Sequence, residues 1–180
     1  MNKTLLSAAL IAGFGVAAFA PQAAHAASTG TINFTGKVYA DTCAINVNGG
    51  ATVALPVVAT SAFAATVGTP LTSSATNFNI ALTACDTNLV SGKVAFTGTN
   101  IDASTGNLKN SLTSNNSNVE IQLLNSSAAV INTSTNVNAP TIALTTGAGT
   151  TQLTAQYITT ATATTAGMVS SSVGFTLTYN

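Results

Sequence analysis

The sequence predicts an all-β protein built as an antiparallel sandwich. Thr, Val, Ile and Phe are frequent, and short apolar stretches alternate along the chain with turns of Gly, Asn and Ser. Many short strands at such a spacing are typical of β-sandwiches. The cysteines fit this fold, because a bond from Cys43 to Cys85 would tie one strand to a later one.

Strands are expected where apolar residues gather between turn residues. Residues 99–118 are rich in Asn, Ser and Gly and predict a loop. The Thr-rich stretch 159–166 predicts another loop, because a strand follows it. Residues 57–67 are ambiguous and suit a helical turn over the edge of a sheet. In chain order, the expected strands are 31–39, 43–47, 52–55, 77–85, 93–99, 119–124, 141–144, 151–157 and 170–179.

Residues 1–26 predict a secretory signal peptide. Lys3 gives a positive start, an apolar run follows from Leu5 to Ala20, and a small-residue site ends at Ala26. A membrane-spanning helix is the alternative, but the run is short for a span and a proline ends it. We therefore expect cleavage after Ala26, and a mature chain of residues 27–180 that forms one domain.

Charge is scarce, which argues against nucleic acid as a partner. After residue 26 the chain holds three Lys, no Arg and four acidic residues, a net charge of −1. A nucleic-acid binder needs clustered positive charge to displace counterions, and these lysines are scattered. The residues are Lys37, Lys93, Lys109, Asp41, Asp86, Asp102 and Glu120.

Catalytic chemistry is hard to assemble from this composition. The only histidine, His25, lies in the expected signal peptide, so a Ser or Thr nucleophile would lack the usual base. Asp86 and Asp102 could in principle form a paired-carboxylate site, but both lie in turn sequences, where Asp bonds local amides. We expect no enzymatic activity, no cofactor and no zinc site. A Ca²⁺ site stays open, although no EF-hand loop is present.

Cys43 and Cys85 are the only cysteines. Because the chain is expected to reach an oxidising compartment, they predict one disulfide. The alternative is two free thiols or half of a metal site, which the lack of a CxxC motif and of His after residue 26 disfavours. The disulfide would close a loop of about 43 residues and contribute about 4 kcal/mol on the chain-entropy model.

The first and last expected strands both alternate strongly. In the last strand, every second residue up to Tyr179 lies on one apolar face, and the same parity runs back through Ser171 and Val169 to Gly167. In the first strand, Ile32 and Val38 bound an alternating face that contains a glycine. The pattern alone also allows an ordinary core strand at each place.

Six fragments of the mature chain together point to a known family. They are GTINFTGKVYADTCAI (30–45), FNIALTACDTN (78–88), KVAFTGTNID (93–102), VEIQLLNSSAAVI (119–131), AQYITT (155–160) and VGFTLTYN (173–180). In these fragments the sequence resembles the major subunits of chaperone–usher pili of the type 1 fimbrial kind. The order of the fragments, the cysteine placement and the two terminal strands make the resemblance specific, and it runs through nearly the whole mature chain.

The resemblance implies an incomplete immunoglobulin-like sandwich that lacks its last strand, with a donor strand from another subunit filling the groove. It divides the mature chain into a donor extension (27–40) and a pilin domain (41–180), and it explains a chain that stops inside a strand. The implied donor residues are Ile32, Phe34, Gly36 and Val38. The implied groove and chaperone-recognition residues are Gly167, Val169, Val173, Phe175, Leu177 and Tyr179.

The expected function is that of a structural subunit of an extracellular pilus that supports cell adhesion. By resemblance, its partners are identical subunits, a periplasmic chaperone and an outer-membrane usher, and a tip adhesin is also allowed. The chain is then exported through the periplasm to a fimbrium on the cell surface. The alternatives are a minor or adaptor subunit, and a secreted carbohydrate-binding sandwich. The absence of Trp disfavours the latter, because such modules often bind sugars with exposed aromatics.

Overall fold

A computed structural model of the chain describes residue 33 and residues 43–48 and 50–180. The chain divides into two units, Met1–Lys37 and Val38–Asn180, and the fold below is that of the described part of the second unit. The expected signal peptide, the expected strand 31–39 and donor residues Ile32, Phe34, Gly36 and Val38 lie outside the described residues.

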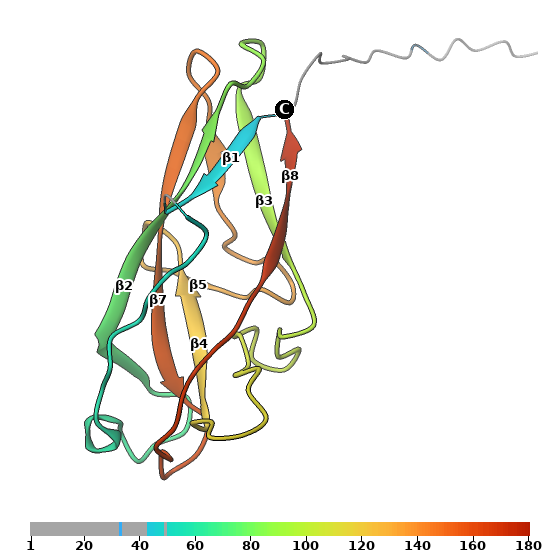
Figure 1. The fold of residues 1–180 in the computed structure, drawn as a ribbon. Coiled ribbons are helices and arrows are strands. Elements are labelled where there is room, and N and C mark those ends of the chain that lie inside the picture. Colours follow the sequence, from blue (N-terminus) through green and yellow to red (C-terminus); the bar gives the residue numbers. More distant parts are fainter. Residues whose placement is uncertain (1–32, 34–42, 49) are drawn as a thin grey trace, which may run out of the picture. The chain divides into compact units, whose positions relative to one another are not determined.

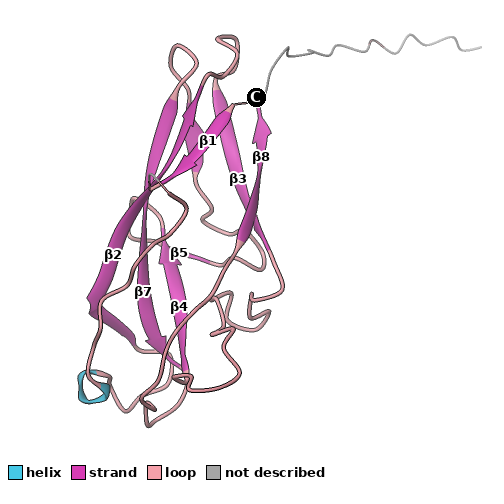
Figure 2. Ribbon diagram, viewed as in Figure 1, coloured by secondary structure: helices cyan, strands magenta, loops and turns pink. Residues whose placement is uncertain are grey.

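Strands dominate the described residues, together with a single turn of 3-10 helix at Thr60–Ala62 (Figure 2). This turn lies within the stretch 57–67, for which a helical turn was the expected interpretation. The described part contains no helix long and apolar enough to cross a membrane. The strands are β1 (Ala44–Val47), β2 (Pro70–Thr83), β3 (Ser91–Thr97), β4 (Val119–Leu124), β5 (Val130–Ile131), β6 (Thr141–Ala143), β7 (Gly149–Thr159) and β8 (Gly174–Tyr179).

The strands form two antiparallel sheets (Figure 1). One sheet has the order β1-β2-β7-β4-β5 and the other the order β6-β3-β8, so β8 is an edge strand. Buried side chains of both sheets, such as Leu82 of β2 and Val94 of β3, belong to one hydrophobic core. The prediction of an antiparallel all-β sandwich is confirmed.

The predicted disulfide is present and joins the ends of two paired strands. Cys43 lies immediately before β1 and Cys85 two residues after β2, and Ala44 pairs with Thr83 between them. The bond therefore closes one end of the β1–β2 ladder and fixes the point where the described chain enters the first sheet. Both cysteines are buried in the core.

Most predicted strands agree with the structure to within a few residues, and β4 matches its predicted range. The largest difference is β2, which begins at Pro70 rather than near residue 77. Its first half carries an irregularity between Leu71 and Thr76, where Ser74 is fully buried. The Ser74 hydroxyl accepts a hydrogen bond from the Tyr157 amide, so a side chain replaces a missing ladder bond. The short β5 was not predicted.

Two predicted strand segments are wrong as regular strands. Residues 52–55 form no strand, and β8 begins at Gly174 rather than at residue 170. In both segments the burial of side chains nevertheless alternates along the chain, as in a strand. A strand is defined by its ladder partner, and each of these segments lies beside open space where a partner would pair.

Candidate functional site

Two segments flank a cleft, one that belongs to no strand and one that ends in the edge strand β8. We call residues 51–58 the N-side wall and residues 167–179 the C-side wall. On the N-side wall, Val53 and Leu55 are half-buried between exposed neighbours, and residues 53–58 make no backbone hydrogen bond to any described residue. On the C-side wall, every odd-numbered residue from Val169 to Tyr179 is half-buried and every even-numbered one is exposed.

The C-side wall is held on one side by β3 and by the loop that follows it. Each residue of β8 pairs with β3, for example Phe175 with Phe96. Below β8, Asn110 takes the place of a partner strand, because its side chain donates to the Met168 carbonyl at 2.8 Å and accepts from the Ser170 amide at 3.1 Å. The loop 98–118 thus continues the support that β3 begins.

The other side of the C-side wall is an open edge. The backbones of Met168, Ser170 and Ser172 make hydrogen bonds on the supported side. The structure shows no such bond from Val169 or Val173 to any described residue. Successive residues of an extended chain point their amides and carbonyls to opposite sides, so the odd-numbered residues offer theirs to the cleft. Such an edge is a template for another strand.

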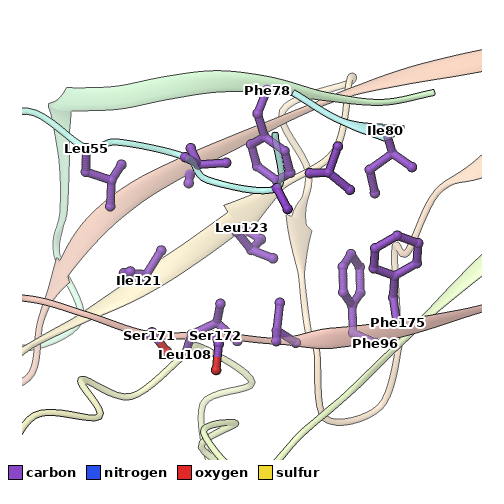
Figure 3. Close-up of a pocket in the computed structure, with 15 residues that line it drawn as sticks. Leu55, Phe78, Ile80, Phe96, Leu108, Ile121, Leu123, Ser171, Ser172 and Phe175 are labelled. Atoms are coloured by element: carbon purple, nitrogen blue, oxygen red, sulfur yellow. The ribbon is translucent and has the colours of Figure 1, made fainter. Parts of the chain in front are cut away.

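The floor of the cleft is the apolar inner face of the larger sheet. The cleft has a volume of about 280 Å³, and Figure 3 shows side chains from β2, β4 and both walls directed toward it. Phe96 and Phe175 lie edge to face at its β3 side, with ring centroids 6.4 Å apart. The lining residues include Val47, Val53, Leu55, Phe78, Ile80, Leu108, Ile121, Leu123, Ala155, Ser171, Ser172 and Val173.

A second pocket continues the cleft between the same two walls. It shares Leu55 with the first and is lined further along by Val57 and Val58 on one side and by Gly167 and Val169 on the other. Tyr157 lies in its lining and contacts Phe63, with ring centroids 6.2 Å apart. Burial raises the pKa of the Tyr157 hydroxyl above its ordinary value.

The structure distributes the sequence-predicted groove residues along this cleft. Val173 and Phe175 line the first pocket, and Gly167 and Val169 line the second. Leu177 lines neither and packs against the core opposite Val94 of β3.

Tyr179 packs against the core in the same way, opposite Gly92 of β3. A Cβ atom at Gly92 would lie 3.4 Å from the tyrosine ring and 3.1 Å from Leu82, so this glycine makes room for Tyr179. The two last predicted residues therefore anchor the wall to the core.

The presence of a glycine at residue 167 has a separate steric explanation. An added Cβ atom there would lie 2.4 Å from the carbonyl carbon of Asn116 and 2.5 Å from the amide nitrogen of Ser117. The next residue, Met168, pairs with this backbone in a parallel bridge. Glycine is therefore needed for the close approach of two backbones at the start of the C-side wall.

Sequence reasoning missed the N-side wall, the floor and Ser171. The alternation of Val53 and Leu55 is a usable signal, but by itself it predicts an ordinary strand of a sheet. Ser171 has the inward parity of its neighbours but is polar, so an apolar pattern does not include it. The floor residues could not be found from one sequence, because the order of strands decides which inward side chains meet.

The acidic residues that the structure describes bond to loop residues. Asp102 accepts hydrogen bonds from the amide and hydroxyl of Ser104, which lower the pKa of Asp102. Asp86 bonds Asn88 in the same manner. Glu120 is buried and accepts from Thr105. In the part of the chain that the structure describes, no three His, Cys, Asp or Glu side chains gather as a metal site.

The fold and the cleft define an immunoglobulin-like β-sandwich with an apolar cleft beside its last strand. The fimbrial protein family model matches residues 32–180, and the chain belongs to this family. It is 34% identical over 178 residues to the F17 fimbrial protein of Escherichia coli, covering 92% of this chain and 95% of that protein. It is 38% identical over 185 residues to the major fimbrial subunit SMF-1 of Stenotrophomonas maltophilia, covering 91% and 99%.

Solved structures agree on the fold. The P pilus rod subunit PapA superposes with a TM-score of 0.55 at 21% identity, covering 83% of this chain and all of that one. A type I fimbria protein of Burkholderia pseudomallei also superposes with a TM-score of 0.55, at 22% identity over 77% of this chain and 94% of that one. The chain is therefore a structural pilus subunit that assembles with other subunits into extracellular surface fimbriae.

Proposed function

We propose that this chain is the main repeating subunit of a fimbria and that its copies are joined by donor-strand exchange. Residues 27–40 of one subunit would enter the cleft of the next. There Ile32, Phe34 and Val38 face the floor, and Gly36 lies where the cleft is shallow. The contact is head-to-tail and does not close, so it propagates into a filament.

The observation that carries this proposal is an apolar floor between two walls whose edges toward the cleft have no strand partner among the described residues. An immunoglobulin-like sandwich normally fills that place with its own strand. An open edge above an apolar cleft otherwise promotes aggregation. A donated strand would cover both the edge and the cleft. The relative from Stenotrophomonas maltophilia is a major subunit, which supports the same role here.

The energy of the joint supports a durable filament. Each of the donated side chains Ile32, Phe34 and Val38 gains about 1.5–3 kcal/mol on burial. Backbone bonds to the odd-numbered residues of the C-side wall add about 0.5–1.5 kcal/mol each. Little of this energy is ionic, because the full chain has four basic and four acidic residues.

Delivery would follow export. We propose that residues 1–26 direct the chain to the periplasm, where a chaperone covers the cleft until an outer-membrane usher exchanges it for the next subunit's extension. The chaperone would pair with the open edge of the C-side wall, which is otherwise exposed to other chains. In this scheme the subunit carries out no catalysis, and its chemistry is strand pairing.

Deletion of residues 27–39 tests the proposal. The shortened subunit keeps its cleft and should still be held by its chaperone, but it cannot fill a neighbour's cleft. Unboiled surface extracts should lose the ladder of SDS-resistant multimers that the unaltered protein gives. A ladder that survives the deletion would show that the subunits are joined elsewhere.

Two point variants refine this test. Gly36→Leu should weaken assembly, because the added side chain faces the floor and overpacking costs about 1–3 kcal/mol. Thr35→Leu adds a similar side chain on the opposite face of the same strand and should leave the ladder intact. Equal effects of the two variants would contradict the proposed facing.

A further inference from the structure

Two acidic side chains lie side by side where the loop 98–118 meets β4. Glu120 belongs to β4 and is buried, with 7% of its surface exposed. The side chain of Asp102 lies within hydrogen-bonding reach of Glu120. Two ionised carboxylates at such a distance repel each other unless a proton or a cation lies between them. The pair therefore calls for a positively charged partner.

Asn107 gives a second, independent observation. Its side chain is 6% exposed, and Nδ2 donates to Oε2 of Glu120 at 3.2 Å, so the amide group is directed at the carboxylate. The other end of the same amide, Oδ1, is enclosed and has no hydrogen-bond partner among the described residues. An unpaired buried acceptor calls for an explanation, and a bound ion is one of the usual ones.

The loop 102–107 holds these oxygen atoms in place. Two backbone bonds close it, from the Gly106 amide to the Asp102 carbonyl at 2.8 Å and from the Asp102 amide to the Asn107 carbonyl at 2.9 Å. The Thr105 hydroxyl donates to Oε2 of Glu120 at 3.1 Å. The bonds from the loop to the Asp102 carboxylate all use Oδ1, which leaves Oδ2 for a further partner.

We propose that this cluster binds one Ca²⁺ ion. Its ligands would be the carboxylates of Asp102 and Glu120, the side-chain oxygen of Asn107 and the hydroxyl of Thr105, with water completing the shell. A set of oxygen ligands suits a hard cation. Ca²⁺ accepts six to eight oxygens in a flexible geometry, whereas Mg²⁺ demands a near-ideal octahedron. A mixed set from one loop and one strand therefore favours Ca²⁺.

Lys109 offers the competing explanation for the acidic pair. Leu108 and Ile121 form an antiparallel bridge, which places Lys109 opposite Glu120 in the register. Lys109 is exposed, however, and an exposed ammonium group keeps its hydration. One lysine would also neutralise only one of the two acids, whereas a divalent ion neutralises both.

The bound ion would tie the loop 98–118 to the larger sheet. Asn110 of the same loop supports the C-side wall through Met168 and Ser170, so the ion would stabilise the wall as well. With two carboxylates, one of them on an exposed loop, the site fits the affinity of extracellular calcium modules, with a Kd of about 10⁻⁴–10⁻³ M.

Calcium uptake by purified fimbriae tests the proposal. Fimbriae stripped with EDTA and dialysed against CaCl₂ should take up one ion per subunit, with half-saturation at about 0.1–1 mM, and MgCl₂ should bind at least about tenfold more weakly. At about 10 mM CaCl₂ the Tm of the subunit should rise by about 3–10 °C relative to EDTA.

Variants of equal size assign the ligands. Glu120→Gln and Asp102→Asn each remove one charge and should weaken calcium binding at least about tenfold. Asn107→Asp places a carboxylate oxygen where Oδ1 lies and should strengthen it. The matched control is Asp86→Asn, because Asp86 bonds Asn88 in a similar loop turn outside the cluster, and its calcium affinity should be unchanged.

Stability without calcium separates a ligand from a merely structural acid. In EDTA, Glu120→Gln should be at least as stable as the unaltered subunit, because it removes the repulsion from Asp102. In CaCl₂ the order should reverse. A Glu120→Gln subunit that is less stable in both solutions to the same degree would show that the carboxylate serves only the fold.

Two further outcomes would overturn the site. One is the lack of saturable uptake by unaltered fimbriae up to about 10 mM CaCl₂, well above the expected Kd. The other is uptake that persists unchanged in both Glu120→Gln and Asp102→Asn, which would place the ion elsewhere. Neither outcome touches donor-strand exchange, which the deletion of residues 27–39 tests separately.

Discussion

At the scale of single residues, Gly167 lies where two backbones come so close that there is no room for a side chain. It lies at the start of the C-side wall, against the peptide between Asn116 and Ser117. Neither neighbouring atom can move without displacing the parallel bridge at Met168. The sequence pattern identified this position through the family resemblance, but the reason for the glycine is visible only in the contact.

Gly167→Ala should therefore destabilise the subunit by about 1–3 kcal/mol through overpacking. Urea unfolding of the purified subunit, followed by circular dichroism, measures the loss. The matched control is Gly50→Ala, because an added Cβ atom at Gly50 meets nothing within 4 Å. Equal stability of the two variants would contradict the steric role of Gly167.

The inward parity of the C-side wall was predictable from the sequence because it needs only the period of a strand. The structure agrees with it at each odd-numbered residue from Val169 to Tyr179. Whether such a face meets its own core or a second chain is not encoded in the period. The presence or absence of a neighbouring strand decides which of the two it meets.

At the scale of elements, Asn110 acts as a substitute for a strand. Its side-chain amide bonds the Ser117 and Met168 carbonyls and accepts from the Leu112 and Ser170 amides. The amide group of Asn110 therefore uses both of its N–H donors and accepts two hydrogen bonds at its oxygen. The wall below β8 keeps its extended form because this side chain, together with backbone bonds from Ser111 and Ser117, supplies what β3 supplies above.

Asn110→Ala should cost about 1–3 kcal/mol, since it leaves several backbone groups unpaired, and it should reduce incorporation into fimbriae. The control is Asn100→Ala, which removes contacts to Ser172 from only one nitrogen atom and should cost less. Subunit stability in urea and the amount of surface fimbriae are the two readouts. A larger loss for Asn100→Ala would argue against Asn110 as the main support.

The disulfide acts on the β1–β2 pair. Cys43→Ser should lower the stability of the subunit by about 2–5 kcal/mol and sharply reduce its periplasmic level. The double variant Cys43→Ser/Cys85→Ser should behave the same, because the bond rather than either thiol is responsible. Normal amounts of assembled fimbriae from the single variant would contradict this expectation.

Local patterns predicted most elements and failed in physically understandable places. The segment Val119–Leu124 forms a ladder on both sides and matches its prediction. Residues 52–55 have the same kind of alternation but no partner, so they are extended without being a strand. The first half of β2 was missed because Pro70 and the Ser and Thr residues after it resemble a turn. Here pairing with β7 overrides local preference.

At the scale of the whole molecule, the scarcity of charge leaves the hydrophobic effect as the main source of cohesion. The chain has equal numbers of basic and acidic residues, four of each. The sheet order that brings β2, β7 and β4 together beneath the cleft could not be read from the sequence. Long-range pairing sets that order, so the floor was beyond prediction although both walls carried a local signal.

Stability should accordingly depend little on ionic strength. Between about 20 mM and 500 mM NaCl, the free energy of unfolding of the subunit should change by less than about 0.5 kcal/mol, because exposed ion pairs contribute little and salt screens them. Urea unfolding at several salt concentrations measures this. A steep loss of stability with salt would point to ionic contacts as a major source of cohesion.

The direction of the open edge has a mechanical consequence. In a filament joined as proposed, tension passes along the covalent chain of the donated strand, parallel to the C-side wall. The load then acts in shear, and the hydrogen bonds to Val169, Ser171 and Val173 share it together rather than opening one after another. A fimbria built on such joints would resist steady pulling by flowing liquid, and rupture would require the whole strand to slide at once.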